Sequence, residues 1–559
     1  MAFPDTDSSA STHSSETQGP HESTIDVTGE KHVRDQGLSD VPFQGNADEK
    51  DIEHEAATTN LQATRSRTSI FSRKSRIVQQ LARDPIPETD LSNNIVGWEG
   101  QEDPAMPMNF PDNRKLLLLC LVSTMTFVAP LASSMFAPGV SFMAAEFHST
   151  STMLDAFTIS IFVLGFAIGP LLLSPLSEIY GRKVVLDCAN GFFVVWQIGC
   201  ALAPNISALL IFRFLAGLGG SGCITLGSGV IADLYTAEAR GKASAIFSLG
   251  PLFGPVVGPI CGGFISQRAG WRWAFWVVLI ASAPTAIGIG FLNRETNHRV
   301  LIERKTLALR KELNRPELRS CYVLPDAPVL TPTQMMSQAI VRPFILLFRS
   351  PIVFILALYM AFIYGLLYLL FTTITSVFQE TYHWSVEICG LAYLGVGIGF
   401  FIGTAVVGKT SDKSVIAQTK KNNGIHVPEF RLPGMIFFAF FVPISFFWYG
   451  WSADKGVHFI VPIIGMVPFG FGMIGLFINI QTYVIDIFPV YAASASASLN
   501  FMRSLFGAVL PLAGPSLYAS LGLGWGNSLL GFIAIAMIPA PMLLWKYGGR
   551  VRERYPVKL

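Results

Sequence analysis

Charged side chains are scarce after about residue 114 of this 559-residue chain, and the hallmarks of most enzymes are missing. There is no glycine-rich nucleotide loop, no cluster of metal ligands and no nucleophile–base arrangement, so we expect neither an enzyme nor a cofactor. The seven cysteines are scattered without metal-ligand spacing and are interpreted as small apolar residues. A net charge of +2 gives no indication of a nucleic-acid partner. The first thirty residues contain no apolar run, so no cleavable signal peptide is expected.

The chain has two parts that differ in amino-acid composition. Residues 1–114 are rich in Ser, Thr and charged residues and poor in aromatics. Such a segment buries too little apolar surface to offset its ordering entropy, so we predict a disordered cytoplasmic tail. From residue 115 onward, long apolar runs dominate, and they would leave a soluble protein without a polar shell. The solvent of this part is therefore expected to be lipid.

Twelve apolar runs are long enough to cross a bilayer, which takes about 20 residues in a helix. The sequence thus predicts an all-α membrane protein with two six-helix bundles, at 115–292 and 351–548. A cytoplasmic loop (293–350) separates the bundles, and a short cytoplasmic tail (549–559) ends the chain. The runs lie near 116–138, 154–175, 184–203, 207–233, 243–265, 272–292, 351–378, 386–408, 433–451, 457–485, 490–520 and 526–547.

The direction of the spans follows from the basic residues of their connecting loops. With the N-terminus inside, the cytoplasmic loops hold nineteen Lys and Arg, against three in the opposite loops. Positive charge accumulates on the cytoplasmic side, so both termini are predicted to be inside. We expect a monomer in the plasma membrane, with the vacuolar membrane as the alternative.

An internal repeat relates the two bundles. Glu178 ends span 2 and Asp412 ends span 8, an offset of 234. Asp233 and Asp486 end spans 4 and 10, an offset of 253, which a Leu-Phe-Gly triplet in spans 5 and 11 shares. A longer loop between spans 8 and 9 accounts for the change. Two parallel six-helix repeats resemble the architecture of the major facilitator superfamily, whose members work by alternating access.

The segment Ser174-Pro-Leu-Ser-Glu-Ile-Tyr-Gly-Arg-Lys183 resembles the loop 2–3 motif of that superfamily. Glu178 can stabilise the positive end of a facing helix, which in the family is span 11. Gly181 allows a tight turn, and Arg182 can pair with Asp233. The motif predicts a latch on the cytoplasmic side; the alternative is an ordinary basic loop. The full set of latch candidates is Glu178, Gly181, Arg182, Lys183, Asp233, Asp412 and Asp486.

Span 5 contains the pattern Gly-Pro repeated every four residues. Glycines at this spacing form a smooth side against which another helix can pack closely, and the prolines remove backbone donors and bend the helix. The pattern resembles the motif of the antiporter branch of the superfamily; the alternative is generic small-residue packing. Its residues are Gly250, Pro251, Gly254, Pro255, Gly258, Pro259, Gly262 and Gly263.

Two arginines lie inside apolar runs, where a charge at the bilayer centre costs at least ~2.5 kcal/mol. Arg213 in span 4 resembles the arginine that the family associates with proton transfer; the alternative is that it reaches the outer headgroups. Arg503 in span 11 has either a transport role or a place in a buried ion pair. Asp155, at the outer end of span 2, is a third candidate for proton coupling. No acidic residue lies at the centre of a span, so the proton carrier is not assigned.

By analogy with the fold, spans 1, 4, 7 and 10 should line the substrate path. Spans 7 and 10 offer an aromatic surface with few charges, which suits flat, apolar or weakly cationic organic molecules. Aromatic residues in membrane helices also commonly face lipid or other helices. The candidates are Tyr359, Tyr364, Tyr368, Asn479 and Gln481.

The stretch Val96-Gly-Trp-Glu-Gly-Gln-Glu-Asp-Pro before span 1, Ala129-Pro-Leu-Ala-Ser-Ser-Met-Phe-Ala-Pro138 in span 1 and Glu295-Thr after span 6 resemble fungal drug:proton antiporters with twelve spans. This resemblance implies proton-driven export of drugs, fungicides, polyamines or secondary metabolites, without choosing among them. The alternatives are a nutrient uptake carrier and a non-transporting membrane sensor.

Overall fold

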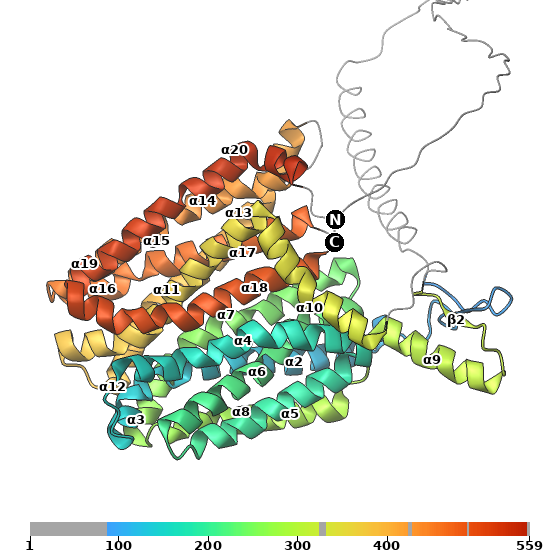
Figure 1. Cartoon of the computed structure of the whole chain (residues 1–559), viewed down its shortest axis with the longest axis horizontal. Coiled ribbons are helices and arrows are strands. Elements are labelled where there is room, and N and C mark those ends of the chain that lie inside the picture. Colours follow the sequence, from blue (N-terminus) through green and yellow to red (C-terminus); the bar gives the residue numbers. More distant parts are fainter. Residues whose placement is uncertain (1–85, 324–330, 423–426, 489–490, 556–559) are drawn as a thin grey trace, which may run out of the picture. The chain divides into compact units, whose positions relative to one another are not determined.

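A computed structural model describes residues 86–323, 331–422, 427–488 and 491–555, which belong to one compact and almost entirely helical unit (Figure 1). The predicted tail up to residue 85 lies outside the described residues. We call the end of the bundle where α2 and α11 begin the proximal end, and the opposite end the distal end. In Figure 1, α9 (His298–Glu312) and α10 (Pro332–Arg349) lie near the proximal end, and α3 (Val140–Glu146) and α12 (Val386–Cys389) near the distal end.

The first half contains six long helices, one for each predicted span. Each connection is short, so consecutive helices run in opposite directions. Between the first two, η2 (Ala137–Gly139) and α3 (Val140–Glu146) form the distal connection. The six are α2 (Asp112–Met135), α4 (Thr152–Tyr180), α5 (Arg182–Ala201), α6 (Ile206–Leu234), α7 (Ala237–Arg268) and α8 (Arg272–Leu292).

The second half repeats this arrangement, but most of its spans are built from two or three consecutive helical pieces. Spans 7, 8 and 9 are α11 (Pro351–Tyr382), α12 (Val386–Cys389) with η3 (Gly390–Tyr393) and α13 (Leu394–Lys421), and α14 (Leu432–Ala439) with α15 (Phe441–Asp454). Span 10 is α16 (Ile460–Gly465) with α17 (Val467–Ile487). Span 11 is α18 (Ala492–Val509) with η5 (Leu510–Ala513) and the start of α19 (Gly514–Met537), and span 12 is the rest of α19 with α20 (Pro539–Arg554).

Among the described residues, eleven helical segments are long and apolar enough to cross a membrane, and the last of them, Ala492–Arg554, holds two crossings. Its 63 residues would extend about 95 Å if straight, three times the roughly 30 Å of a bilayer core. The backbone reverses near Gly522, whose φ of +73° is non-helical. The predicted twelve-span fold is therefore confirmed.

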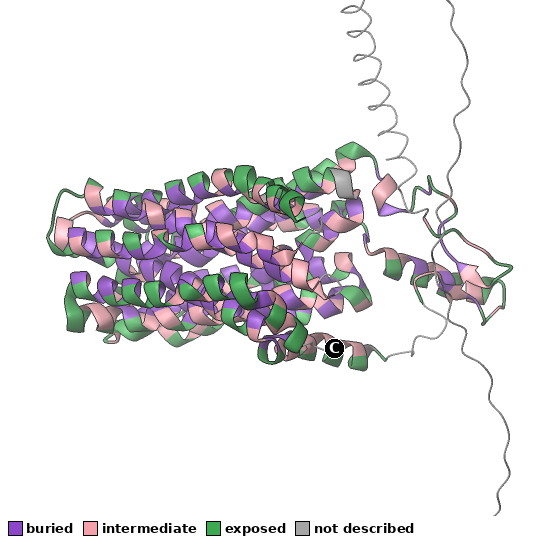
Figure 2. Ribbon diagram, turned by 90° about the horizontal axis from the view of Figure 1, so that it is seen from above, coloured by how far each residue is buried: buried purple, intermediate pink, exposed green. Residues whose placement is uncertain are grey.

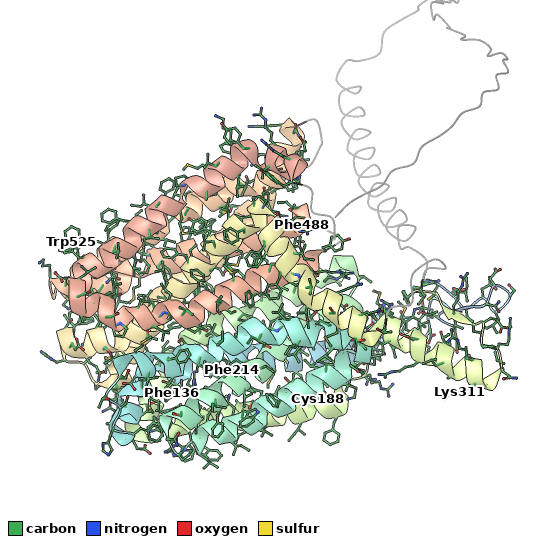
Figure 3. The ribbon with its side chains drawn as sticks, in the orientation of Figure 1. Phe136, Cys188, Phe214, Lys311, Phe488 and Trp525 are labelled. Atoms are coloured by element: carbon green, nitrogen blue, oxygen red, sulfur yellow. The ribbon has the colours of Figure 1, made fainter. Side chains whose placement is uncertain are left out.

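Apolar side chains cover the outside of the bundle as well as its interior. Figure 2 shows buried positions concentrated between helices and exposed ones along the outer faces. Many of the exposed residues are large and apolar, including Ile280, Phe291 and Phe401. Trp525, labelled in Figure 3, is another. An apolar belt of this extent fits a protein solvated by lipid.

A small folded module at the proximal end corrects the predicted boundary of the tail. Strand β1 (Ile95–Val96) pairs in parallel with β2 (Arg319–Ser320), beside α9 (His298–Glu312). Trp98 is buried against α9, and its Nε1 donates to the Tyr322 hydroxyl at 3.1 Å. Burial raises the pKa of the Tyr322 hydroxyl above its ordinary value. Residues 86–111 are therefore not disordered, because the central loop completes their core.

Candidate functional site

The glycine stripe, comprising Gly250, Gly254, Gly258 and Gly262, lies against α2 along its length. A Cβ at Gly254 would lie 2.8 Å from the Phe127 carbonyl oxygen, and one at Gly258 would lie 2.8 Å from that of Leu131. Both distances are shorter than real Cβ contacts, so only glycine allows the two backbones to approach this closely. The stripe therefore sets the separation between α7 and α2.

The opposite side of α7 meets the second half at the distal end. A Cβ at Gly390 would lie 2.7 Å from the Pro259 carbonyl oxygen, and one at Gly263 would lie 2.8 Å from that of Val386. The Arg268 guanidinium pairs with Glu387 at 3.0 Å. Helix α7 is thus held between α2 of its own half and the α12–η3 segment of the other half.

Arg213 is buried inside the first half, with 1% of its surface exposed. Its Nη2 donates to the carbonyl oxygens of Ser133 and Ile159, at 3.1 and 3.3 Å. Its guanidinium lies 5.1–5.6 Å from the ring centroids of Phe136, Phe162 and Phe275, which come from three different parts of the bundle; Phe136 is labelled in Figure 3. The interpretation that Arg213 reaches the headgroups is wrong, because the side chain is enclosed by rings that stabilise the cation.

The same Ser133 links this arginine to the second half. Its hydroxyl donates to the Pro130 carbonyl at 2.6 Å, so the 2.9 Å contact with Tyr368 has the tyrosine hydroxyl as donor. Both side chains are buried. The Tyr368 ring lies 5.2 Å from the ring of Tyr364, between centroids. A chain of contacts therefore runs from Arg213 across the boundary between the halves to the tyrosines of α11.

Arg503 continues this chain at its other end. Its guanidinium lies 5.0 Å from the ring centroids of both Tyr364 and Phe477, so α18 contacts α11 and α17 through one cation. These two rings also line a small pocket with Met360, Ile363, Met473, Leu476 and Ile480. Within the described part of the chain, no carboxylate pairs with Arg503 and no hydrogen bond engages it, and its Nε is buried without a partner. The described residues thus offer no buried ion pair for it.

The other predicted cavity residues serve the packing of the second half. Asn479 donates to the Gly475 carbonyl at 2.7 Å, one turn earlier in its own helix. Gln481 donates to Ser496 at 2.8 Å and so joins α17 to α18. Tyr359 is buried in the apolar core. Of the five candidates, the structure brings together only Tyr364 and Tyr368 near a charged group.

Part of the predicted latch is assembled at the proximal end. Arg182 Nε lies 3.5 Å from Asp233 Oδ2, and its Nη1 donates to Ser177 at 2.6 Å. Gly181 turns the chain with φ of +102°, and the space beside it is filled by the Glu295 carboxylate. Glu295 accepts the backbone N–H of Arg182 at 2.7 Å and therefore caps the start of α5.

The second half repeats the ion pair. Asp486 at the end of α17 pairs with Arg431, which precedes α14, just as Asp233 at the end of α6 pairs with the arginine that begins α5. In each half, the carboxylate at the end of the fourth span therefore pairs with an arginine at the start of the third span. This geometry supports the repeat that the offset of 253 predicts.

Other predicted latch and coupling residues are placed apart from these clusters. Glu178 is exposed and forms no hydrogen bond or ion pair with another described residue. Lys183 is divided: its side chain pairs with Asp187 at 3.1 Å, one turn along α5, whereas its backbone N–H donates to the Glu295 carboxylate of the proximal cluster at 3.3 Å. The side chain of Asp412 lies outside the described residues. Asp155 lies in the first turn of α4, and its Oδ1 is buried without a partner among the residues described.

Three residues of these clusters were not among the functional candidates predicted from the sequence. Ser133, Phe477 and Glu295 carry no signal of their own, although Glu295 belongs to a segment with a family resemblance. The roles of Ser133 and Glu295 depend on partners more than 110 residues away, Tyr368 and Arg182, and Phe477 contacts an arginine on a different helix. Among the described residues, no group of three His, Cys, Asp or Glu side chains is placed to hold a metal ion.

Comparison with known proteins agrees with this geometry. The family model of the Major Facilitator Superfamily matches residues 122–511. The MFS-type transporter penM of Penicillium rubens is 49% identical over 82% of this chain and 89% of its own length. The efflux pump radE of Floropilus chiversii is 43% identical over 86% of this chain and 88% of its own length. The xylose transporter XylE from E. coli, partially occluded and inward open, shares the fold with a TM-score of 0.58 and 18% identity, covering 78% of this chain and 98% of XylE.

Proposed function

Because the chain belongs to the Major Facilitator Superfamily of membrane transporters, we propose that it exports small organic molecules in exchange for protons. The observation that carries this proposal is the glycine stripe of α7. It lies against α2 at a separation that only glycine allows, while the other side of α7 meets the second half. A relative 43% identical to this chain is an efflux pump by name, which favours export over uptake.

Alternating access requires the two halves to separate at one end while they close at the other. In this conformer, Gln267 accepts the backbone N–H of Val386 at 3.1 Å, and Ser160 donates to the Ala508 carbonyl at 2.8 Å. Both contacts join the halves away from the proximal ends of their helices. We infer that this conformer is closed distally, with Glu178 not engaged at the proximal end.

The excess of basic residues in the proximal loops supports cytoplasmic termini. With that orientation, a distally closed conformer receives its substrate from the cytoplasm. Proton influx would then supply the energy for export, and the plasma membrane is the location that suits expulsion from the cell. The monomer is sufficient for this scheme, since both halves lie in one chain.

The test measures the accumulation of a panel of fluorescent amphipathic compounds in cells with and without the full chain. We expect the chain to lower accumulation of at least one compound, and a protonophore that collapses the proton gradient to abolish the difference. An Arg550→Gln variant, altered at an exposed position near the end of the chain, is the matched control and should behave as the unmodified protein. Equal accumulation across the panel with and without the chain would refute export.

A further inference from the structure

We propose that the substrate of this chain is a planar organic acid, and that Arg503 binds its anionic group while Tyr364 and Phe477 contact its ring. This inference rests on the proposed function and names the chemical class that the same path accepts. It replaces the expectation of apolar or weakly cationic substrates. Three observations on the described residues support it.

The first observation is the distribution of charge along the spans. Every Asp and Glu with a described side chain in a span lies within five residues of an end of its helix, as Asp155, Asp187 and Asp486 illustrate. Arg213 lies seven residues into α6, and Arg503 lies eleven residues into α18. Within the described part of the chain, the middle of the bundle therefore carries positive charge without a balancing carboxylate.

The second observation is the state of the Arg503 guanidinium. Two aromatic rings hold it at 5.0 Å from their centroids, and it donates no hydrogen bond to any described residue. Arg213, in contrast, already donates to two carbonyl oxygens and is fully enclosed. A guanidinium presents a rigid fork of N–H donors that matches a carboxylate or an enolate. Arg503 is thus oriented by its rings and still free to donate.

The third observation is the pocket beside the two rings that contact Arg503. Tyr364, Phe477 and Arg503 are all only partly buried, and the two rings line a pocket whose remaining walls are aliphatic or methionine. Flat rings stack on aromatic side chains, and methionine adapts to different shapes. A cationic substrate would meet Arg503 with like charge in a medium of low dielectric constant, which disfavours its binding. A planar anion gains both contacts at once.

The test compares three fluorescent probes that share the anthracene ring system: 9-anthracenecarboxylate, 9-anthracenemethanol and 9-anthracenemethylammonium. Binding to the full chain is measured in nanodiscs of zwitterionic lipid, with empty nanodiscs as background. We expect the carboxylate to bind at least about ten-fold more tightly than the ammonium. Arg503→Gln should weaken carboxylate binding about ten-fold or more and change alcohol binding less than about two-fold.

Two variants complete the design. Arg550→Gln removes a charge at an exposed position and should leave all three affinities unchanged. Arg503→Lys keeps the positive charge but lacks the fork of N–H donors, so it should weaken binding of the carboxylate alone, and by less than Arg503→Gln does. It replaces Arg503→Gln in the test if that variant fails to fold. Tightest binding of the ammonium probe would overturn the proposal. So would an equal loss of all three probes in either folded Arg503 variant.

Transport of the same probes into proteoliposomes separates this inference from the proposed function. Carboxylate-selective binding without proton-dependent flux leaves the anion site standing and counts against antiport. Proton-dependent flux without charge preference upholds antiport and overturns the anion site.

Discussion

Gly258 lies in the middle of the glycine stripe, and replacing it with alanine tests how closely α7 and α2 must approach. An added Cβ would lie 2.8 Å from the Leu131 carbonyl oxygen and 3.0 Å from the Met135 nitrogen. Both atoms belong to the backbone of α2, so the clash cannot be relieved by a side-chain rotation. The helices would have to separate by several tenths of an ångström.

The size of the effect follows from a matched substitution. Gly191 lies on an exposed face of α5, and an added Cβ there meets nothing within 4 Å. In both variants alanine gains up to about 1 kcal/mol of helix propensity over glycine. At Gly258 the clash costs about 1–3 kcal/mol in addition. Because the propensity gain is common to both, the free energies of unfolding should differ by about 1–3 kcal/mol.

Titration of the full chain with a denaturing detergent, in the same lipid mixture, measures this difference. Gly191→Ala should be neutral or stabilising, and Gly258→Ala should be the less stable variant. Transport by Gly258→Ala should also fall, since α7 touches both halves of the protein. Equal stability of the two alanine variants would refute the argument that the stripe sets the separation of the helices.

Two further predictions concern single contacts. Arg182→Ala removes the ion pair with Asp233 and should impair transport, while the amount of protein in the membrane stays largely the same; unaltered flux at equal abundance would count against a latch. Tyr368→Phe removes the donor to Ser133 and should lower the free energy of unfolding by about 1 kcal/mol. Tyr449→Phe is its control, because that buried hydroxyl has no partner among the described residues and its loss should not destabilise the protein; equal values for the two would show that the bond to Ser133 contributes nothing.

The twelve spans were predictable because each is a local property of about twenty consecutive residues. The predicted boundary between the last two spans also agrees with the structure, although the helix is nearly continuous there. Gly522, the residue whose φ departs from the helix, falls between the predicted runs ending at 520 and beginning at 526. Local composition therefore determined the fold at this level.

The proximal module shows where this reasoning stops. Val96, Trp98 and Met106 are too widely spaced to produce a periodic signal, and the surrounding sequence is polar. They are buried only because Ile302 and Leu318, two hundred residues later, complete the core. A composition window covering residues 1–114 contains none of that information.

The candidate site was predictable in its charges but not in its surroundings. Arg213 and Arg503 stand out in sequence because a lone cation in an apolar run is costly. The rings that stabilise Arg213 come from residues 136, 162 and 275, and no spacing within one helix relates them. The sequence therefore identified which residues needed an explanation, and the tertiary structure supplied it.

The nature of the contacts between the halves fits a protein whose halves must separate. A buried ion pair broken during each cycle would leave two uncompensated charges, at a cost of several kcal/mol. The central contact is instead the bond between Ser133 and Tyr368, two neutral hydroxyls worth about 1 kcal/mol. The distal ion pair uses Arg268, whose side chain is 73% exposed, so water replaces its partner at little cost. The two arginines inside the spans, Arg213 and Arg503, each contact rings within a single half, so the boundary can open while both cations keep their ring contacts.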